Sequence, residues 1–198
     1  MLEMQSRMNA RVHEQWIDQD FEWYRAVWIE CGELMDHVGY KWWKKQVADM
    51  EQVRLEVIDI WHFGMSALFG ADTDLDALAT QIAAELAQSQ GSEDIRSATE
   101  ALAQHALESR AVAVPGVANV MQACERAADA LYQHYVGKNV LNFFRQDHGY
   151  QDGTYIKQWQ DREDNEHLSE LLQTLDHTAA TFPDALYQAL LARYKALT

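Results

Sequence analysis

Helix-breaking residues are scarce in this chain of 198 residues, and this scarcity constrains the fold more than any other feature. Only two prolines occur, Pro115 and Pro183, and glycine occurs nine times. Because proline and glycine are the residues that most often end helices, their scarcity favours long helices. Apolar residues also recur at spacings of three and four, which is the helical period. We therefore expect an all-α fold, a multi-helix bundle.

The pattern predicts helices over nearly the whole chain. Gly39 is a suitable stop for one of them, and Thr73 or Asp74 is a suitable N-cap for another. No internal repeat, low-complexity run or linker is visible, so we expect a single domain over residues 1–198. The predicted helices span residues 2–16, 17–38, 49–69, 75–89, 93–112, a stretch from the Pro115–Gly116 pair to about 135, 138–146, 164–176 and 183–197.

The composition excludes several classes of protein. A net charge of −15 argues against a general nucleic-acid binder, which needs a basic face, and against an anionic membrane surface as partner. Cys31 and Cys124 are isolated, so neither a disulfide framework nor a zinc site is indicated. The first residues show no signal peptide, and charged residues or histidine interrupt every apolar stretch short of a membrane span. We expect a cytoplasmic protein.

The segment 53–69 carries the strongest signal of chemistry. It is apolar on nearly every side, which predicts a buried central helix. Among its few polar residues, Glu56, Asp59, His62 and Ser66 are spaced three or four apart and share one face. Buried carboxylates are costly unless a cation or hydrogen bonds compensate them. The pattern therefore indicates a positive partner on this face.

A second pair of carboxylates, Glu30 and Glu33, lies on the predicted helix 17–38 at the same i, i+3 spacing. If the two helices pack antiparallel, the carboxylates of Glu30, Glu33, Glu56 and Asp59 converge. Hard oxygen ligands without cysteine suit Mg²⁺, or Mn²⁺ as a substitute, better than zinc or copper. Because Mg²⁺ commonly takes further ligands from phosphate, a nucleotide is the natural co-ligand.

Two other interpretations of these acids remain open. Lysines 41, 44 and 45 and Arg54 are available to neutralise the acids in ordinary salt bridges. Asp59-x-x-His62 and Asp164-x-x-His167 are similar in spacing to the ligands of ferritin-like di-iron bundles. Those bundles use Glu rather than Asp at the first position, and Asp164 falls beside a predicted loop, so this alternative ranks behind Mg²⁺.

The C-terminal third adds a set of basic and polar residues. Lys138, Asn142 and Arg145 are spaced four and three and lie on one helix face. A glycine-containing loop is able to fold Tyr150 and Lys157 back onto that face. In a chain this acidic, such a cluster indicates a polyanionic ligand. The alternative is a set of ordinary salt bridges to the acidic surface.

Together these motifs resemble the dimeric all-α dUTPase family, within the MazG-like superfamily of nucleoside triphosphate pyrophosphohydrolases. The resemblance covers residues 1 to about 168. Family members often carry Lys where this chain has Gln151 and Gly where it has Gln160, and the region 71–115 is shorter here. The matching blocks are Glu30-Cys-Gly-Glu33-Leu, Lys41-Trp-Trp-Lys44, Glu56-Val-Ile-Asp59-Ile-Trp-His-Phe63, Gly137-Lys-Asn-Val-Leu-Asn-Phe-Phe-Arg145, Gly149-Tyr-Gln-Asp-Gly-Thr-Tyr-Ile-Lys157 and Glu163-Asp-Asn165.

The resemblance implies roles for individual residues. Glu30, Glu33, Glu56 and Asp59 would bind Mg²⁺, and Glu33 would also orient or deprotonate the attacking water. Gln5 and Asn9 would read uracil, with Trp43 or Trp42 stacked on the base. His62 either contacts a ligand of the metal and holds it in place or is a core histidine with its hydrogen bonds satisfied. Four residues would hold the phosphates and one the nucleoside: Lys138, Arg145, Tyr150 and Lys157, and Asn142.

The resemblance thus implies a homodimeric, Mg²⁺-dependent enzyme that hydrolyses dUTP, and also dUDP, to dUMP. Two rivals differ in function. One is a MazG-like pyrophosphohydrolase acting on another nucleotide such as dCTP, and the other is a non-catalytic nucleotide-binding protein that keeps the fold. The intact set of four carboxylates disfavours the non-catalytic protein.

Overall fold

A computed structural model describes residues 1–91, 94–124 and 128–197. Its described part is all-α apart from one small hairpin, which confirms the expected fold class. The elements are α1 (Leu2–Val12), a 3-10 helix (Trp16–Gln19), α2 (Trp23–Val38), α3 (Met50–Ser66), α4 (Leu75–Leu86), α5 (Ile95–Ser109), α6 (Val114–Ala123), α7 (Ala128–Asp147), β1 (Gln158–Trp159), β2 (Arg162–Glu163), α8 (Asp164–Thr174) and α9 (Phe182–Leu197).

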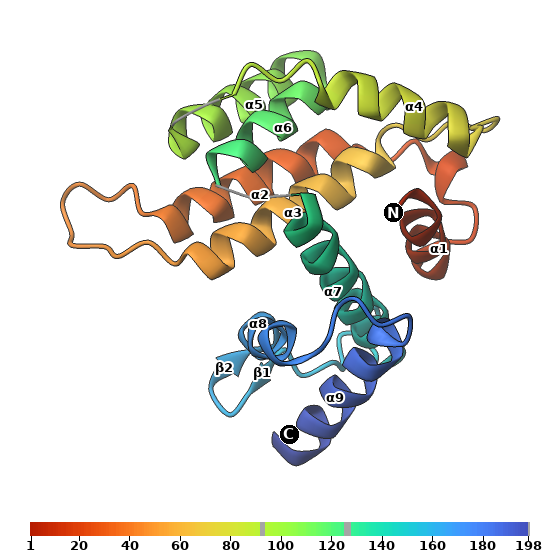
Figure 1. Cartoon of the computed structure of the whole chain (residues 1–198), viewed down its shortest axis with the longest axis vertical. Helices are drawn as coiled ribbons and strands as arrows, with labels where there is room; N and C mark the ends of the chain where they lie inside the picture. Colours follow the sequence, from red (N-terminus) through yellow and green to blue (C-terminus); the bar gives the residue numbers. More distant parts are fainter. Residues whose placement is uncertain (92–93, 125–127, 198) are drawn as a thin grey trace.

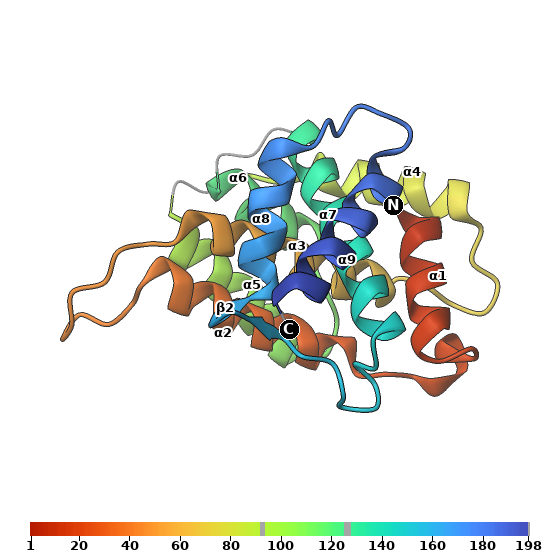
Figure 2. The same ribbon diagram turned by 90° about the horizontal axis from the view of Figure 1, so that it is seen from below.

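The helices α2 and α3 form an antiparallel pair at the centre of the molecule, and the other helices lie on two sides of it (Figure 1). The helices α4, α5 and α6 cover one side, whereas α7, α8 and α9 lie on the other. Figure 2, seen from below, shows α7, α8 and α9 together in front, with α1 at the edge of the molecule. The first helix contacts both α3 and α7. This arrangement places α1, α2, α3, α7 and α8 around a common region.

The predicted burial of the third helix is confirmed. Val53, Leu55 and Ile60 of α3 have no exposed surface, and Trp61 is almost fully buried. Glu56 and His62 are buried as well, although both are polar. Because burial removes these groups from water, their surroundings decide their charge state.

Local sequence signals explain several helix ends. The carboxylate of Asp49 accepts a hydrogen bond from the backbone N–H of Gln52 and so caps α3. Asp74 accepts from two backbone N–H groups at the start of α4, as the sequence predicts. Gly39 ends α2 with a positive φ of 87°, a backbone conformation that glycine adopts more readily than other residues. The predicted stop at Gly39 and one of the two predicted caps, Asp74, are therefore confirmed, and Asp49 is a cap that was not predicted.

Several predicted boundaries are wrong. The first helix ends at Val12 rather than residue 16, and α2 begins only at Trp23, because a 3-10 turn and an extended linker lie between them. The predicted short helix over 138–146 is instead the second half of a 20-residue helix, α7. Ser92 and Glu93 at the expected start of another helix, and 125–127 within the expected helix to residue 135, lie outside the described residues.

The hairpin of β1 and β2 was not predicted. Gln158 pairs with Glu163 and Trp159 with Arg162, and the two-residue turn between them is Gln160–Asp161. Both turn residues have positive φ, 49° and 63°, the geometry of a type I′ turn. Neither residue is a glycine, which hides the turn in the sequence. The hairpin leads directly into α8.

Candidate active site

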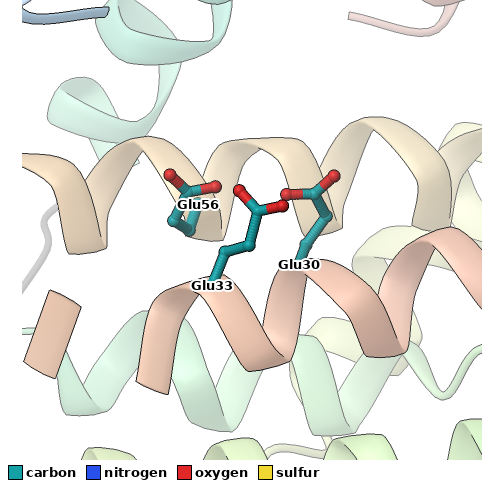
Figure 3. A group of neighbouring side chains, drawn as sticks. All are labelled: Glu30, Glu33 and Glu56. Atoms are coloured by element: carbon teal, nitrogen blue, oxygen red, sulfur yellow. The ribbon is translucent and has the colours of Figure 1, made fainter. Parts of the chain in front are cut away.

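Three glutamates from the central helix pair meet at one point. Glu30 and Glu33 lie on α2, and Glu56 lies on α3 (Figure 3). The carboxylate of Glu33 lies between those of Glu56 and Glu30. One oxygen from each of the three lies within 4.8 Å of the others. The i, i+3 spacing on α2 and the antiparallel packing of α3 therefore bring together three of the four predicted metal ligands.

The surroundings of this glutamate cluster, Glu30, Glu33 and Glu56, disfavour its negative charge. Burial, together with the nearby carboxylates of Asp59, Glu56 and Glu33, raises the pKa of Glu30 well above its ordinary value. Burial also raises the pKa of Glu56, an effect that the ammonium of Lys138 partly opposes. The glutamates thus repel one another in a partly desolvated space.

Little in the described part of the chain compensates this charge. His37 Nε2 lies 3.6 Å from Glu56 Oε1, and no lysine or arginine there forms a salt bridge with any of the three glutamates. Three hard oxygen donors that form no salt bridge with a lysine or arginine of this part of the chain are a donor set that fits Mg²⁺ or Mn²⁺. The alternative of plain salt bridges therefore fails for this cluster, since Lys41 pairs with Asp36 and Arg54 with Glu51.

Asp59, the fourth predicted ligand, is not part of the glutamate cluster. Its Oδ2 lies 2.6 Å from the ammonium of Lys138, and its Oδ1 lies 3.7 Å from His62 Nδ1. We expected four carboxylates to converge, but only three of them do, because Lys138 of α7 lies beside the fourth. Asp59 still lines the same region as Glu30.

Two of the predicted phosphate ligands are already engaged by carboxylates. Lys138 is buried, and its ammonium also donates to Asn165 Oδ1 at 3.0 Å. Arg145 donates two hydrogen bonds of 2.8 Å to the two oxygens of Asp164, a fully buried residue. The Tyr155 hydroxyl donates to the same carboxylate. The guanidinium beside Asp164 holds the pKa of that carboxyl below its usual range despite the opposing effect of burial.

The other predicted phosphate ligands are more open. Lys157 is about half exposed and forms a salt bridge of 3.0 Å with Glu163 at the end of the hairpin. Tyr150 is also about half exposed, and its ring lies 5.8 Å from the guanidinium carbon of Arg145. Asn142 accepts a hydrogen bond from Arg145 at 3.2 Å. The predicted cluster is therefore assembled, with each lysine and arginine paired to an acid.

Two adjoining cavities share this region. The first, of about 410 Å³, holds the glutamate cluster together with Lys138 and Lys157, and we call it the charged cavity. The second, of about 340 Å³, is lined by amides and aromatic rings from α1, the following linker and α3, and we call it the aromatic cavity. Four residues line both cavities and mark where they join: Glu30, Asp59, Arg145 and Tyr150.

A buried amide network lies at the wall of the aromatic cavity. Gln5 and Asn9, both predicted to read a base, donate to the hydroxyl of Ser66 at 3.0 and 2.9 Å. Gln5 also donates to Asn9 Oδ1, and the Tyr135 hydroxyl donates to Gln5 Oε1. The Ser66 hydroxyl donates to the carbonyl of His62. These bonds fix the orientation of two amides against α3.

The sequence analysis missed several residues at this cavity. Ser66 was placed on the polar face of α3 with His62, but its hydrogen bonds with Gln5 and Asn9 were not predicted. Trp16, Phe21, Trp23 and Phe63 line the aromatic cavity and were not singled out as site residues. Aromatic residues in a tryptophan-rich segment look like ordinary core residues in a sequence, so no signal identified them.

Trp43, predicted to stack on a base, does not join the site within one chain. Trp43 and Trp42 lie in the loop between α2 and α3, which projects beyond the helices (Figure 1). Their exposed fractions are 61% and 90%. Neither residue lines the charged or the aromatic cavity.

His62 is buried between Asp59 and the ring of Tyr135, with ring centroids 4.7 Å apart. Its Nε2 has no hydrogen-bond partner in the described part of the chain. Burial lowers the pKa of His62 to about 4, so the ring is neutral at neutral pH. The neutral His62 ring therefore does not compensate the negative charge of the carboxylates in the site.

Comparison with known proteins relates the chain to one protein family. A family model described as dUTPase matches residues 1–150, which is 150 of the 198 residues. The match includes Glu30, Glu33, Glu56 and Arg145 and ends before Lys157. No curated protein matches the chain. Among the described residues, no helix combines the length and the apolar character needed to cross a membrane.

Proposed function

Since the chain belongs to the dUTPase family, we propose that it is a Mg²⁺-dependent enzyme that hydrolyses dUTP, and also dUDP, to dUMP. The observation that carries this proposal is the glutamate cluster, whose three carboxylates approach one another with no lysine or arginine in a salt bridge to them among the described residues. Such an arrangement is unfavourable in a protein that never binds a cation there. Mn²⁺ would serve as a substitute because it accepts the same ligands.

The residues of the aromatic cavity would bind the base, and those of the charged cavity would bind the phosphates. Gln5 and Asn9, held by Ser66, would offer fixed amide groups to the edge of uracil in the aromatic cavity. Arg145 lines both cavities, so it would contact the phosphates nearest the nucleoside. Lys157 and Tyr150 would bind the outer phosphates from the more open side of the charged cavity.

Glu33 is the group best placed to act on water. It is the exposed member of the glutamate cluster, and it lines the charged cavity but not the aromatic one. A carboxylate in this position would accept a hydrogen bond from a water molecule and orient it toward a phosphorus atom. Bound Mg²⁺ would supply neutralisation of the charge that develops on the phosphate oxygens.

The test is product analysis with a panel of deoxynucleotides in the presence of Mg²⁺. We expect dUMP and pyrophosphate from dUTP, with dCTP, dTTP and dATP much poorer substrates. A preference for dCTP would instead favour the related pyrophosphohydrolase activity, and nucleotide binding without turnover would favour a binding protein. A preference for dCTP would overturn the proposed substrate, and binding without turnover would overturn the proposed activity.

The role of Glu33 is tested separately. Glu33→Gln keeps the size and hydrogen bonding of the side chain but removes the charge, so we expect turnover to fall by a factor of about 10² or more while nucleotide binding is retained. Glu100→Gln is the matched control, because Glu100 is an exposed glutamate of α5 away from both cavities. Near-normal turnover by Glu33→Gln would exclude the assigned role.

We also propose that the protein is a homodimer in which Trp43 of one subunit approaches the base site of the other. The exposure of Trp42, Trp43 and Val47 in one projecting loop supports this arrangement, since exposed apolar clusters of this kind mark contact surfaces. Light scattering of the purified protein tests the assembly. The double variant Trp42→Ser and Trp43→Ser should weaken it, and a monomeric wild-type protein would contradict it.

A further inference from the structure

Lys138 has an unusual position for a lysine. Its side chain is 1% exposed, although it carries an ammonium group at the end of a flexible stem. Asp59 Oδ2 lies 2.6 Å from this ammonium, and Asn165 Oδ1 lies 3.0 Å from it. Buried lysines are rare unless they are paired, so the acid explains why this one is tolerated. Asp59 and Lys138 form a local ion pair between α3 and α7.

This ion pair changes what Asp59 is able to do. Its carboxylate is near enough to the glutamate cluster to raise the pKa of Glu30, yet it is not one of the three groups that converge. A divalent cation at Asp59 would lie beside the Lys138 ammonium and be repelled by it. The contact with Lys138 therefore weakens the affinity of Asp59 for a metal ion for as long as it lasts.

The same lysine lines the charged cavity together with Arg145, Tyr150 and Lys157. A lysine side chain has several rotatable bonds and no fixed direction of hydrogen bonding. A polyphosphate in that cavity carries more negative charge than the Asp59 carboxylate and competes for the ammonium. Lys138 is thus within reach of two alternative anionic partners.

We propose that Lys138 acts as a built-in counter-ion that determines when Asp59 becomes a metal ligand. Without nucleotide, Lys138 holds Asp59, and only the glutamate cluster binds a divalent cation. When a nucleoside triphosphate enters, its phosphates take over the ammonium, and the released Asp59 carboxylate completes the site for one more cation. This inference rests on the proposed function and adds an order of binding to it.

The experiment counts bound Mn²⁺ by the loss of the free-ion signal in electron paramagnetic resonance. We expect the wild-type protein to bind one ion per chain without nucleotide and, once the ions chelated by the free analogue are subtracted with a protein-free control, at least one more with the non-hydrolysable analogue α,β-imido-dUTP. Lys138→Met should bind the additional ion without nucleotide, with an affinity at least about tenfold higher than that of the wild-type protein. Equal counts for the wild-type protein with and without the analogue would overturn the proposal.

Two matched variants separate the effect of this one charge from a general change in electrostatics. Lys138→Arg keeps a cation beside Asp59 and should restore the wild-type count without nucleotide. Lys195→Met removes an exposed lysine of α9 that lines neither cavity, and it should also leave that count unchanged. An additional ion in Lys195→Met would assign the effect to overall charge and refute the specific role of Lys138.

The wild-type comparison keeps the proposal testable even if Lys138→Met does not fold, because it needs no variant. The outcome is also distinguishable from that of the proposed function. Hydrolysis of dUTP with an unchanging Mn²⁺ count would refute only the role of Lys138. A count that depends on Lys138 in a protein that does not hydrolyse dUTP would support that role and refute the proposed reaction.

Discussion

The glutamate cluster leads to a prediction about stability that needs no substrate. Glu30→Gln removes one of three carboxylates whose oxygens lie within 4.8 Å of one another. At that separation and an effective dielectric constant of about 20, two full charges would repel each other by about 3.5 kcal/mol. Near pH 8 the folded wild-type protein avoids this repulsion only by keeping Glu30 protonated, because the pKa of Glu30 is raised to about 9, and taking up that proton on folding costs free energy that a neutral Gln does not incur. Solvent screens the exposed Glu33, so we expect the metal-free variant to be about 1–2 kcal/mol more stable than the wild-type protein near pH 8.

The assay is thermal unfolding with EDTA and then with excess Mg²⁺. For a chain of this length, 1 kcal/mol corresponds to about 2–4 °C in Tm, so Glu30→Gln should melt about 2–8 °C higher in EDTA. With Mg²⁺ the order should reverse, because bound cation stabilises the wild-type protein and the variant has lost a ligand. A variant that melts below the wild-type protein in EDTA would refute the reasoning.

The same cluster predicts the pH dependence of the metal-free protein. Because folding raises the pKa values of Glu30 and Glu56 above their ordinary value of 4.5, the folded state holds more protons than the unfolded state. The contribution of these groups to stability is therefore complete below that value and is lost as the pH rises through neutrality. In wild-type protein with EDTA we expect Tm to fall over this range, and Mg²⁺ should flatten the dependence.

Three further variants test other parts of the site. Asp164→Asn leaves Arg145 buried without its acid, and we expect a loss of about 3–5 kcal/mol in unfolding experiments with denaturant. Ser66→Ala removes the hydroxyl that orients Gln5 and Asn9; a rise of several-fold in KM for dUTP with little change in kcat would support the amide network, and an unchanged KM would contradict it. Gln160→Gly relieves a left-handed turn residue, which should raise stability by about 0.5–1 kcal/mol in a thermal melt, whereas a lower Tm would argue against strain there.

The convergence of Glu30, Glu33 and Glu56 was predictable because helical periodicity is a local property. Residues three apart on one helix share a face wherever the helix lies. When the rest of the helix surface is apolar, only a few elements of the fold are able to lie against its polar face. The same periodicity predicted the buried character of α3. Local spacing therefore determined which acids face the centre of the molecule.

The partners of Asp59 and Trp43 could not be predicted in the same way. Whether Asp59 meets a metal or a lysine depends on how α7 crosses α3, and 79 positions of chain separate Asp59 from Lys138. Trp43 lies in a loop whose direction no periodic pattern specifies. The hairpin turn at Gln160–Asp161 was hidden because its residue types are atypical for its backbone geometry. Long-range packing and irregular backbone thus explain why these three features were not predicted from the sequence.

The pairing of every base in the charged cavity has a consequence for binding. Lys138, Arg145 and Lys157 are each in contact with a carboxylate, so the three bases are matched by three acids before the glutamate cluster is counted. The site as a whole is therefore negative, and a polyphosphate entering it alone would meet net repulsion. Divalent cation must then contribute to nucleotide binding as well as to the reaction. Calorimetry with α,β-imido-dUTP should detect binding with Mg²⁺ and at least tenfold weaker binding in EDTA, and equal affinities would show that the bases alone suffice.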